Sequence, residues 1–165
     1  QASTLGMMVW IGIGISSPLI GTWSTLVNNR KIPLVASAAI GVLAALAVLY
    51  VAMPIWAMYI VLLIFGMGAA GQSLIFAVVQ DNNAPSVVGT ALGFNNLAVV
   101  AGGALCQPLA GFLLRLHWSG TTKGGIPIYG IHDFKQALML LPICFGVALI
   151  VSLFFLHETK CKPQY

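Results

Sequence analysis

Five long stretches of apolar residues constrain this sequence more than any other feature. Each is long enough to cross a bilayer, whose hydrocarbon core takes about 20 apolar residues in helical form. In lipid only helices and closed barrels satisfy every backbone polar group, and barrel strands need an alternating polarity that these stretches lack. We therefore predict an all-α fold, a polytopic bundle of five transmembrane helices in a single membrane domain. The predicted spans cover residues 2–27, 32–51, 54–80, 85–116 and 134–156.

Composition agrees with a membrane environment and argues against a nucleic-acid partner. Charged residues make up 6% of the chain, whereas soluble domains carry about 25%. The net charge of +4 comes from single or paired basic residues, with no basic run that could follow a phosphate backbone. We interpret the basic excess as loop charge facing lipid headgroups and cytosol, so the bilayer is the first expected partner.

The connections between the spans fall on two sides of the membrane. Five crossings place residues 28–31, residues 81–84 and the carboxyl-terminal tail on one side, and the loop 117–133 on the other. We expect this loop to be ordered, with Trp118 and Tyr129 anchored at headgroup level. Four basic residues on the first side against three on the second favour a cytoplasmic first side only weakly. The amino terminus lacks a signal-peptide pattern and is expected to be a cut end within a longer protein.

The fourth span carries the most informative polar residues. Asn96 and Gln107 lie on one helical face with small residues, at alternating steps of three and four. An amide in lipid lacks hydrogen-bond partners, so both are expected to face protein or a watery cavity, and Gly89 and Gly93 permit close helix approach. Packing alone explains Gln107 equally well. Asn95 points about 100° away from Asn96 and shares a cavity with it only if that cavity is wide.

Two other spans supply further candidates for a solute site. The third span has one face of small residues, which indicates helix packing. Gln72 lies on a different face of that helix and is expected to line a cavity. Ser16 of the first span lies in a stretch of glycine, serine and proline, and broken helices at mid-depth often border substrate paths. Trp10, about two turns away, is either a cavity wall or an interfacial anchor. The predicted substrate-binding set is Asn96, Gln72, Asn95, Gln107, Ser16 and Trp10.

Enzymatic, metal and cofactor chemistry has no candidate residues. Every acidic residue and every histidine lies in a connection or at an end of a span, so neither a proton relay nor a carboxylate ion site is expected within the spans. The three cysteines are far apart in sequence and have no ligand spacing, so neither a disulfide nor a metal site is predicted. We therefore expect a protein that is not an enzyme and has no cofactor.

The segment GTWSTLVNNRK resembles the signature after the eighth helix of major facilitator transporters, G-x-x-x-D-R-x-G-R-[RK]. Gly21, Arg30 and Lys31 match this motif, which the resemblance implicates in gating. Thr25, Leu26 and Asn28 stand where the family has aspartate, arginine and the inner glycine, which removes the acidic partner of a gating salt bridge. The later part of the chain is similar to the tenth and eleventh helices, and LHETKCKP resembles the charged close after the twelfth.

This resemblance implies that the chain is the carboxyl-terminal half of such a transporter, helices eight to twelve, and that the amino-terminal half is a missing partner. Helices eight, ten and eleven would then border a central cavity, and nine and twelve would face lipid. The implied function is secondary active or facilitative transport of a small organic solute across the bacterial inner membrane by alternating access. Residues 28–31, residues 81–84 and the tail would be cytoplasmic. Within the family, nutrient and amino-acid transporters of intracellular bacteria are the most similar.

Two other function classes remain open at this stage. A non-transporting anchor or assembly module would use the same polar faces for ordinary packing, and a channel subunit would line a pore with them. A transporter half is expected to leave Asn96, Gln72 and Ser16 open toward one shared cleft, whereas a closed module would bury them against one another.

Overall fold

The computed structural model describes residues 2–118, 120, 122–123 and 126–163. Helices dominate these residues, and the two strands are two-residue segments that pair antiparallel in the loop after α5. The four remaining residues of that loop, 119, 121, 124 and 125, lie outside the described part, so the predicted order of the loop is not addressed there. The elements are α1 (Ala2–Val27), α2 (Lys31–Tyr50), α3 (Ile55–Ala69), α4 (Gly71–Asn82), α5 (Val88–Leu116), β1 (Thr122–Lys123), β2 (Ile126–Pro127), α6 (Ile131–Leu138) and α7 (Leu140–Phe154).

Five helical segments are long and apolar enough to cross a membrane, which confirms the predicted helical bundle. They are Ser3–Val27, Lys31–Tyr50, Ile55–Asn82, Val88–Leu116 and Ile131–Phe154. Their ends differ from the predicted ones by up to three residues. α4 and α6 extend over the polar residues Asp81 and Asp133, whereas α5 begins three residues after the predicted start.

Two of the five segments are interrupted, which the apolar pattern does not predict. The third divides into α3 and α4 at Ala70, and the fifth divides into α6 and α7 at Met139. The second interruption has a clear cause, because Pro142 lies in the first turn of α7 and has no N–H to donate to a preceding carbonyl. The interruption at Ala70 lies within the run of small residues that surrounds Gly68 and Gly71.

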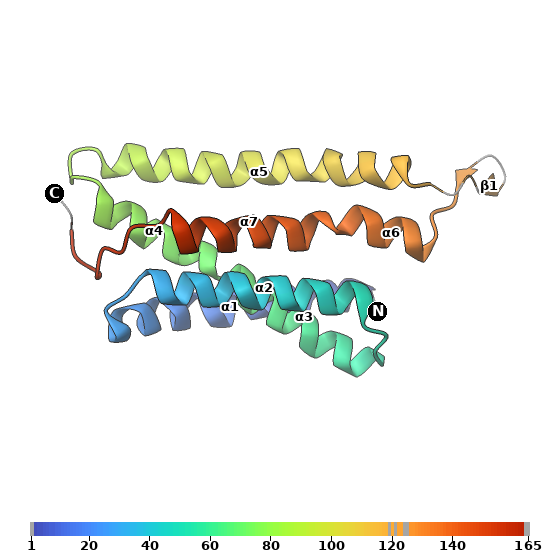
Figure 1. Ribbon diagram of the computed structural model, residues 1–165, viewed down its shortest axis with the longest axis horizontal. Helices are drawn as coiled ribbons and strands as arrows, with labels where there is room; N and C mark the ends of the chain where they lie inside the picture. Colours follow the sequence, from blue (N-terminus) through green and yellow to red (C-terminus); the bar gives the residue numbers. More distant parts are fainter. Residues whose placement is uncertain (1, 119, 121, 124–125, 164–165) are drawn as a thin grey trace.

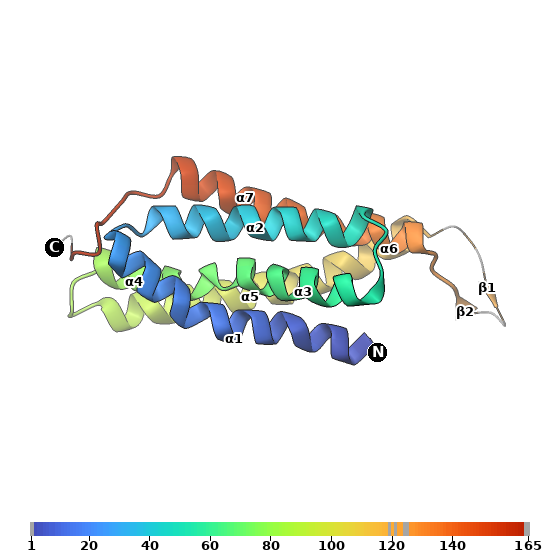
Figure 2. The ribbon, with the colours of Figure 1, turned by 90° about the horizontal axis from the view of Figure 1, so that it is seen from below.

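The helices run lengthwise beside one another and carry the loops at two opposite ends (Figures 1 and 2). The α1–α2 and α4–α5 connections and the carboxyl-terminal tail meet at one end. The amino terminus, the α2–α3 connection and the β1–β2 hairpin lie at the other end. This arrangement agrees with the five crossings predicted from the sequence.

Glycines set the closest helix contacts. A Cβ at Gly12 of α1 would meet the Leu63 carbonyl of α3, and a Cβ at Gly66 would meet the Val9 carbonyl of α1. On the other side of α3, a Cβ at Gly68 would lie 2.6 Å from the backbone nitrogen of Gly41 in α2. Backbone therefore packs directly on backbone along α1, α3 and α2, which is how helices associate most closely in lipid.

Two helices differ from the expectations drawn from their glycines. α1 is continuous through Pro18 rather than broken, and Ser17 Oγ donates to the Ile13 carbonyl at 2.8 Å within it. α5 has no buried residue, and at Gly89 and Gly93 an added Cβ would meet no described atom within 4 Å. The close approach predicted for these two glycines is therefore not made by the described part of this chain.

Replacing Gly66 with alanine is expected to destabilise the bundle by about 1 to 3 kcal/mol, because the added methyl overpacks the α1–α3 contact against backbone atoms that cannot rotate away. Gly93→Ala is the matched control in α5 and should leave stability unchanged. Thermal unfolding of the purified chain in detergent measures both. Equal melting temperatures for the two variants would contradict the α1–α3 packing.

Candidate functional site

The predicted polar face of α5 is open in this chain. Asn96 and Gln107 are both exposed, and Val100, which lies between them on the same face, is 61% exposed. An exposed stripe that combines amides with apolar residues is costly to leave against lipid. The face is therefore suited to contact another protein unit or a water-filled space.

The remaining candidates do not share one cleft with this face. Gln72 is exposed and lines a cavity of about 260 Å³ between α2, α3, α4 and α7. Ser16 is buried and lines a separate cavity of about 180 Å³ between α1, α2 and α3. Gln107 lines a third, of about 270 Å³, where α5 faces α6 and α7. Trp10 is 75% exposed, as suits a residue on the outer surface of α1.

Two of the predicted residues have polar atoms that are buried without a partner. The hydroxyl of Ser16 and the amide nitrogen of Asn95 make no hydrogen bond within the described part of the chain. Buried polar groups are normally paired, so these two atoms are available to a water molecule or a solute. Asn95 is half-buried and Asn96 exposed, in keeping with their different directions on the helix.

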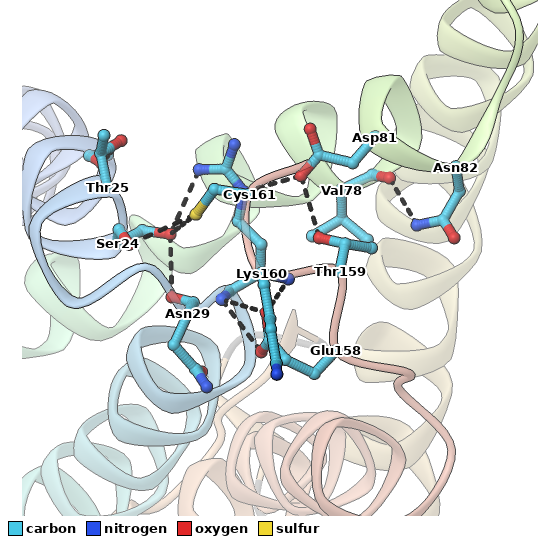
Figure 3. Close-up of polar contacts among 12 residues, drawn as sticks. Ser24, Thr25, Asn29, Val78, Asp81, Asn82, Glu158, Thr159, Lys160 and Cys161 are labelled. Carbon is cyan, nitrogen blue, oxygen red and sulfur yellow. Dashed lines mark hydrogen bonds and ion pairs between the residues drawn. The ribbon is translucent and has the colours of Figure 1, made fainter. Parts of the chain in front are cut away.

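A polar cluster joins three segments at the end of the bundle where the tail lies (Figure 3). Arg30, from the α1–α2 connection, donates from Nε to Asp81 Oδ2 of α4 at 2.8 Å, and both side chains are nearly buried. Thr159 of the tail donates to the same oxygen at 3.0 Å. We call this set the tail cluster; it consists of Ser24, Arg30, Asp81, Glu158, Thr159 and Cys161.

Ser24 of α1 completes the link between the tail cluster and the first helix. Its hydroxyl is fully buried, donates to the Asn29 carbonyl at 3.0 Å and accepts from Arg30 Nη1 at 3.2 Å. The thiol of Cys161 donates to the Ser24 carbonyl at 3.4 Å. Arg30 therefore bridges α1 and α4, while the tail closes over both.

Glu158 binds the amino-terminal end of α2. Its carboxylate accepts hydrogen bonds from the backbone N–H groups of Arg30 and Lys31 at distances from 2.7 to 3.0 Å. A helix amino terminus has unpaired N–H groups and a positive dipole end, so an anion there is stabilising. Lys31, predicted as a gating residue, thus contributes its backbone to this contact.

The charges of the tail cluster stabilise one another. Burial by itself raises the pKa of the Glu158 carboxyl group. Hydrogen bonds from the backbone N–H groups of Arg30, Lys31 and Lys160, together with the Arg30 charge, lower it by more, so the pKa lies below its ordinary value. Burial lowers the pKa of Arg30, while its hydrogen bond to Asp81 and the charge of Asp81 raise it above its ordinary value. Both groups are therefore ionised at neutral pH.

The motif residues have distinct structural positions. Thr25, at the position of the family's aspartate, donates to the Gly21 carbonyl at 3.1 Å and makes no ion pair with Arg30. Asp81 from α4 supplies that acidic partner instead. Asn28 has a φ of 53°, a conformation that glycine adopts freely and asparagine tolerates better than most residues. This explains how asparagine can stand where the motif has glycine.

Sequence reasoning missed Asp81, Glu158 and Thr159 as members of a site. Each lies in a connection or near a helix end, where a charged residue is usually interpreted as solvated. The available signal was that acidic residues are rare in this chain, and two of the three lie on the same predicted side as Arg30.

Comparisons with protein families, with curated proteins and with solved structures give no match to this chain. Its function is therefore argued from the sequence and the geometry.

Arg30→Gln is expected to lower the free energy of unfolding by about 1 to 3 kcal/mol, because it leaves the nearly buried Asp81 carboxylate without its charged donor. Arg115→Gln is the matched control, since Arg115 is exposed in the last turn of α5. Thermal unfolding in detergent compares the two variants. A loss of stability as large for Arg115→Gln as for Arg30→Gln would contradict the structural role of the ion pair.

Acidification is expected to release the tail from α2. Because the folded state lowers the pKa of Glu158, its contribution is present above the unfolded value of about 4.3 and is lost as pH falls through the lower folded value. Hydrogen exchange of the Arg30 and Lys31 amides, followed by mass spectrometry after correction for intrinsic rates, should show protection that disappears over this acidic range. Glu158→Gln should have weak protection at every pH. Retention of strong, pH-dependent protection in Glu158→Gln would refute the assignment.

Proposed function

We propose that this chain is the later half of a transporter of the major facilitator type, which carries a small organic solute across a membrane by alternating access. The observation that carries the proposal is the open face of α5, on which Asn96 and Gln107 are exposed within a helix long enough to span a bilayer. These amides need a protein partner or a watery cavity. A second helical unit that packs over a central solute site supplies both.

The contrast between the two sides of the bundle supports this arrangement. α1, α2 and α3 pack backbone to backbone through Gly12, Gly66 and Gly68, and the tail cluster holds the end of α1 and the start of α2 to α4. α5 contacts mainly α4 and α6 and buries no residue. A firmly packed body with one open polar helix suits a half that rocks against its partner around a site at mid-depth.

In this proposal Asn96 is the principal solute contact, because it is an exposed amide within the spanning part of α5. Asn95, with its unpaired amide nitrogen, extends the polar surface, and Gln107 lies further along the same helix, whereas Gln72 lines a separate cavity. Ser16 lines a separate cavity between α1, α2 and α3, and Trp10 lies on the outer surface of α1, so neither is part of the solute site proposed here. Gly21, Arg30 and Lys31 belong to the end of the bundle that opens and closes. In this proposal that end faces the cytoplasm, and the protein lies in the inner membrane.

The tail cluster suits such a gating end. Arg30, Asp81 and Thr159 meet at one carboxylate oxygen, so separation of any one segment breaks contacts in the other two. The solute that we propose is a small organic molecule. Nutrients such as amino acids fit the family resemblance and the neutral amide surface.

Thiol accessibility distinguishes the three function classes without a known solute. Asn96→Cys in the complete protein, on a background without the native cysteines, is expected to react with a membrane-impermeant thiol reagent. Leu43→Cys is the control, because Leu43 lies inside α2, a helix that the family resemblance places against lipid, and is 68% exposed. It should react slowly.

The pattern of labelling gives the decision. A transporter should show Asn96→Cys accessible from one side at a time, with the accessible side changed by a solute or a conformation-selective binder. Simultaneous access from both sides would indicate a channel, and no access from either side would indicate a closed module. Either of these two results would overturn the proposal. In a transporter, Asn96→Ala should reduce uptake of the identified solute at matched expression.

A further inference from the structure

A cavity of about 180 Å³ lies between α1, α2 and α3, apart from the open face of α5. It forms because α1 and α2 each pack closely on α3 but contact one another little. We call it the Ser16 cavity. Two serines, Ser16 and Ser37, line it, and its apolar lining consists of Leu19, Ile20, Trp23, Pro33, Ile40 and Met67.

The two serines of the Ser16 cavity differ in their hydrogen bonds. Ser37 donates to the Leu34 carbonyl at 2.9 Å within its own helix, so its proton is already used. Ser16 is only 5% exposed, and its hydroxyl makes no hydrogen bond within the described part of the chain. Because buried hydroxyl groups are normally paired, this one indicates that the polar group of a ligand belongs beside Ser16.

The Ser16 cavity opens sideways, at the outer surface of two helices that are long and apolar enough to span a membrane. Leu19 and Trp23 of α1 and Ile40 of α2 line the cavity, and all three are also exposed at that surface. A molecule dissolved in the hydrocarbon of the bilayer therefore reaches the cavity between α1 and α2 without first entering water.

The size and the lining of the cavity select the kind of ligand. A cavity of about 150 Å³ is large enough for one benzene ring. An acyl chain of a lipid has no hydrogen-bonding group to offer Ser16, and a water molecule needs two to four polar partners, whereas most of this lining is apolar. A single aromatic ring that carries one hydroxyl group fits both the apolar lining and the unpaired serine.

We propose that the Ser16 cavity binds a small, lipid-soluble phenol, whose hydroxyl group pairs with Ser16 and whose ring lies against Trp23 and Met67. Phenol and serine hydroxyls both donate and accept, so the bond forms in either direction. Aromatic rings and the methionine sulfur provide favourable contacts for the ring. The bound phenol connects α1 with α2, and it is an effector of the bundle rather than the transported solute, because this cavity is separate from the open face of α5.

The test follows the fluorescence of Trp23 in the full chain, reconstituted in lipid nanodiscs. Trp10→Phe, Trp56→Phe and Trp118→Phe leave Trp23 as the single reporter. The probes are para-bromophenol and bromobenzene, whose bromine atom quenches tryptophan on contact, and their affinities are compared at equal concentrations in the membrane. Para-bromophenol should quench Trp23 saturably and bind about three- to tenfold more tightly than bromobenzene, which is what one neutral hydrogen bond contributes.

Substitution of Ser16 shows whether its hydroxyl causes the preference. Ser16→Ala should weaken the binding of para-bromophenol to the level of bromobenzene and leave bromobenzene unchanged. Ser17→Ala is the matched control, because Ser17 donates to the Ile13 carbonyl and does not line the cavity, and it should keep the preference.

Three results would overturn the proposal. They are quenching that rises linearly with either probe, as simple partition into the bilayer would give, equal affinities for the two probes, and a preference for para-bromophenol that survives in Ser16→Ala. The unmodified chain should show the same saturable, phenol-selective component in its total fluorescence. The outcome therefore does not depend on how well the chain tolerates the tryptophan replacements.

Discussion

Direct contact between helix backbones holds this bundle together. Lipid tails are as apolar as leucine side chains, so the helices gain little from hydrophobic burial and depend on close van der Waals packing. Gly12 and Gly66 let α1 and α3 touch, and Gly68 brings α3 onto α2. The central position of α2 follows, because α3 and α7 pack against it from two sides.

The tail cluster adds a second, polar form of cohesion where the backbone contacts end. Arg30 and Asp81 are nearly buried, where an unpaired charge would destabilise the fold. Each charge therefore offsets the desolvation cost of the other. Glu158 uses the unpaired N–H groups of α2 in the same way. These contacts hold together the loop after α1, the end of α4 and the tail, because each charged group is compensated by its partner.

α5 follows a different principle from the other spanning helices. Its amides and glycines meet few partners within the described chain, although an amide needs a hydrogen-bond partner that lipid does not supply. A helix of this kind makes sense when its partners come from outside the chain, as in the proposed transporter.

The sequence by itself determined the class of fold, because spans such as residues 32–51 are apolar along their whole length and lipid permits few alternatives to a helix. It also indicated Asn96 as an amide needing a partner, since that argument depends only on the type of residue and its depth. The cause of the α6–α7 interruption, Pro142, is present in the sequence. A hydropathy average over a whole span does not reveal the effect of one proline.

Only the tertiary structure decided which distant residues meet. The pairing of Arg30 with Asp81 and the contact of Glu158 with α2 each join segments separated by many residues. Helical periodicity places a residue on a face but does not say which other helix that face meets. The same limit explains why Ser16, Gln72 and Gln107, all plausible cavity residues, line three separate cavities. Neighbours between helices follow from the rotation and tilt that glycine contacts impose, and those are properties of the assembled bundle rather than of any one span.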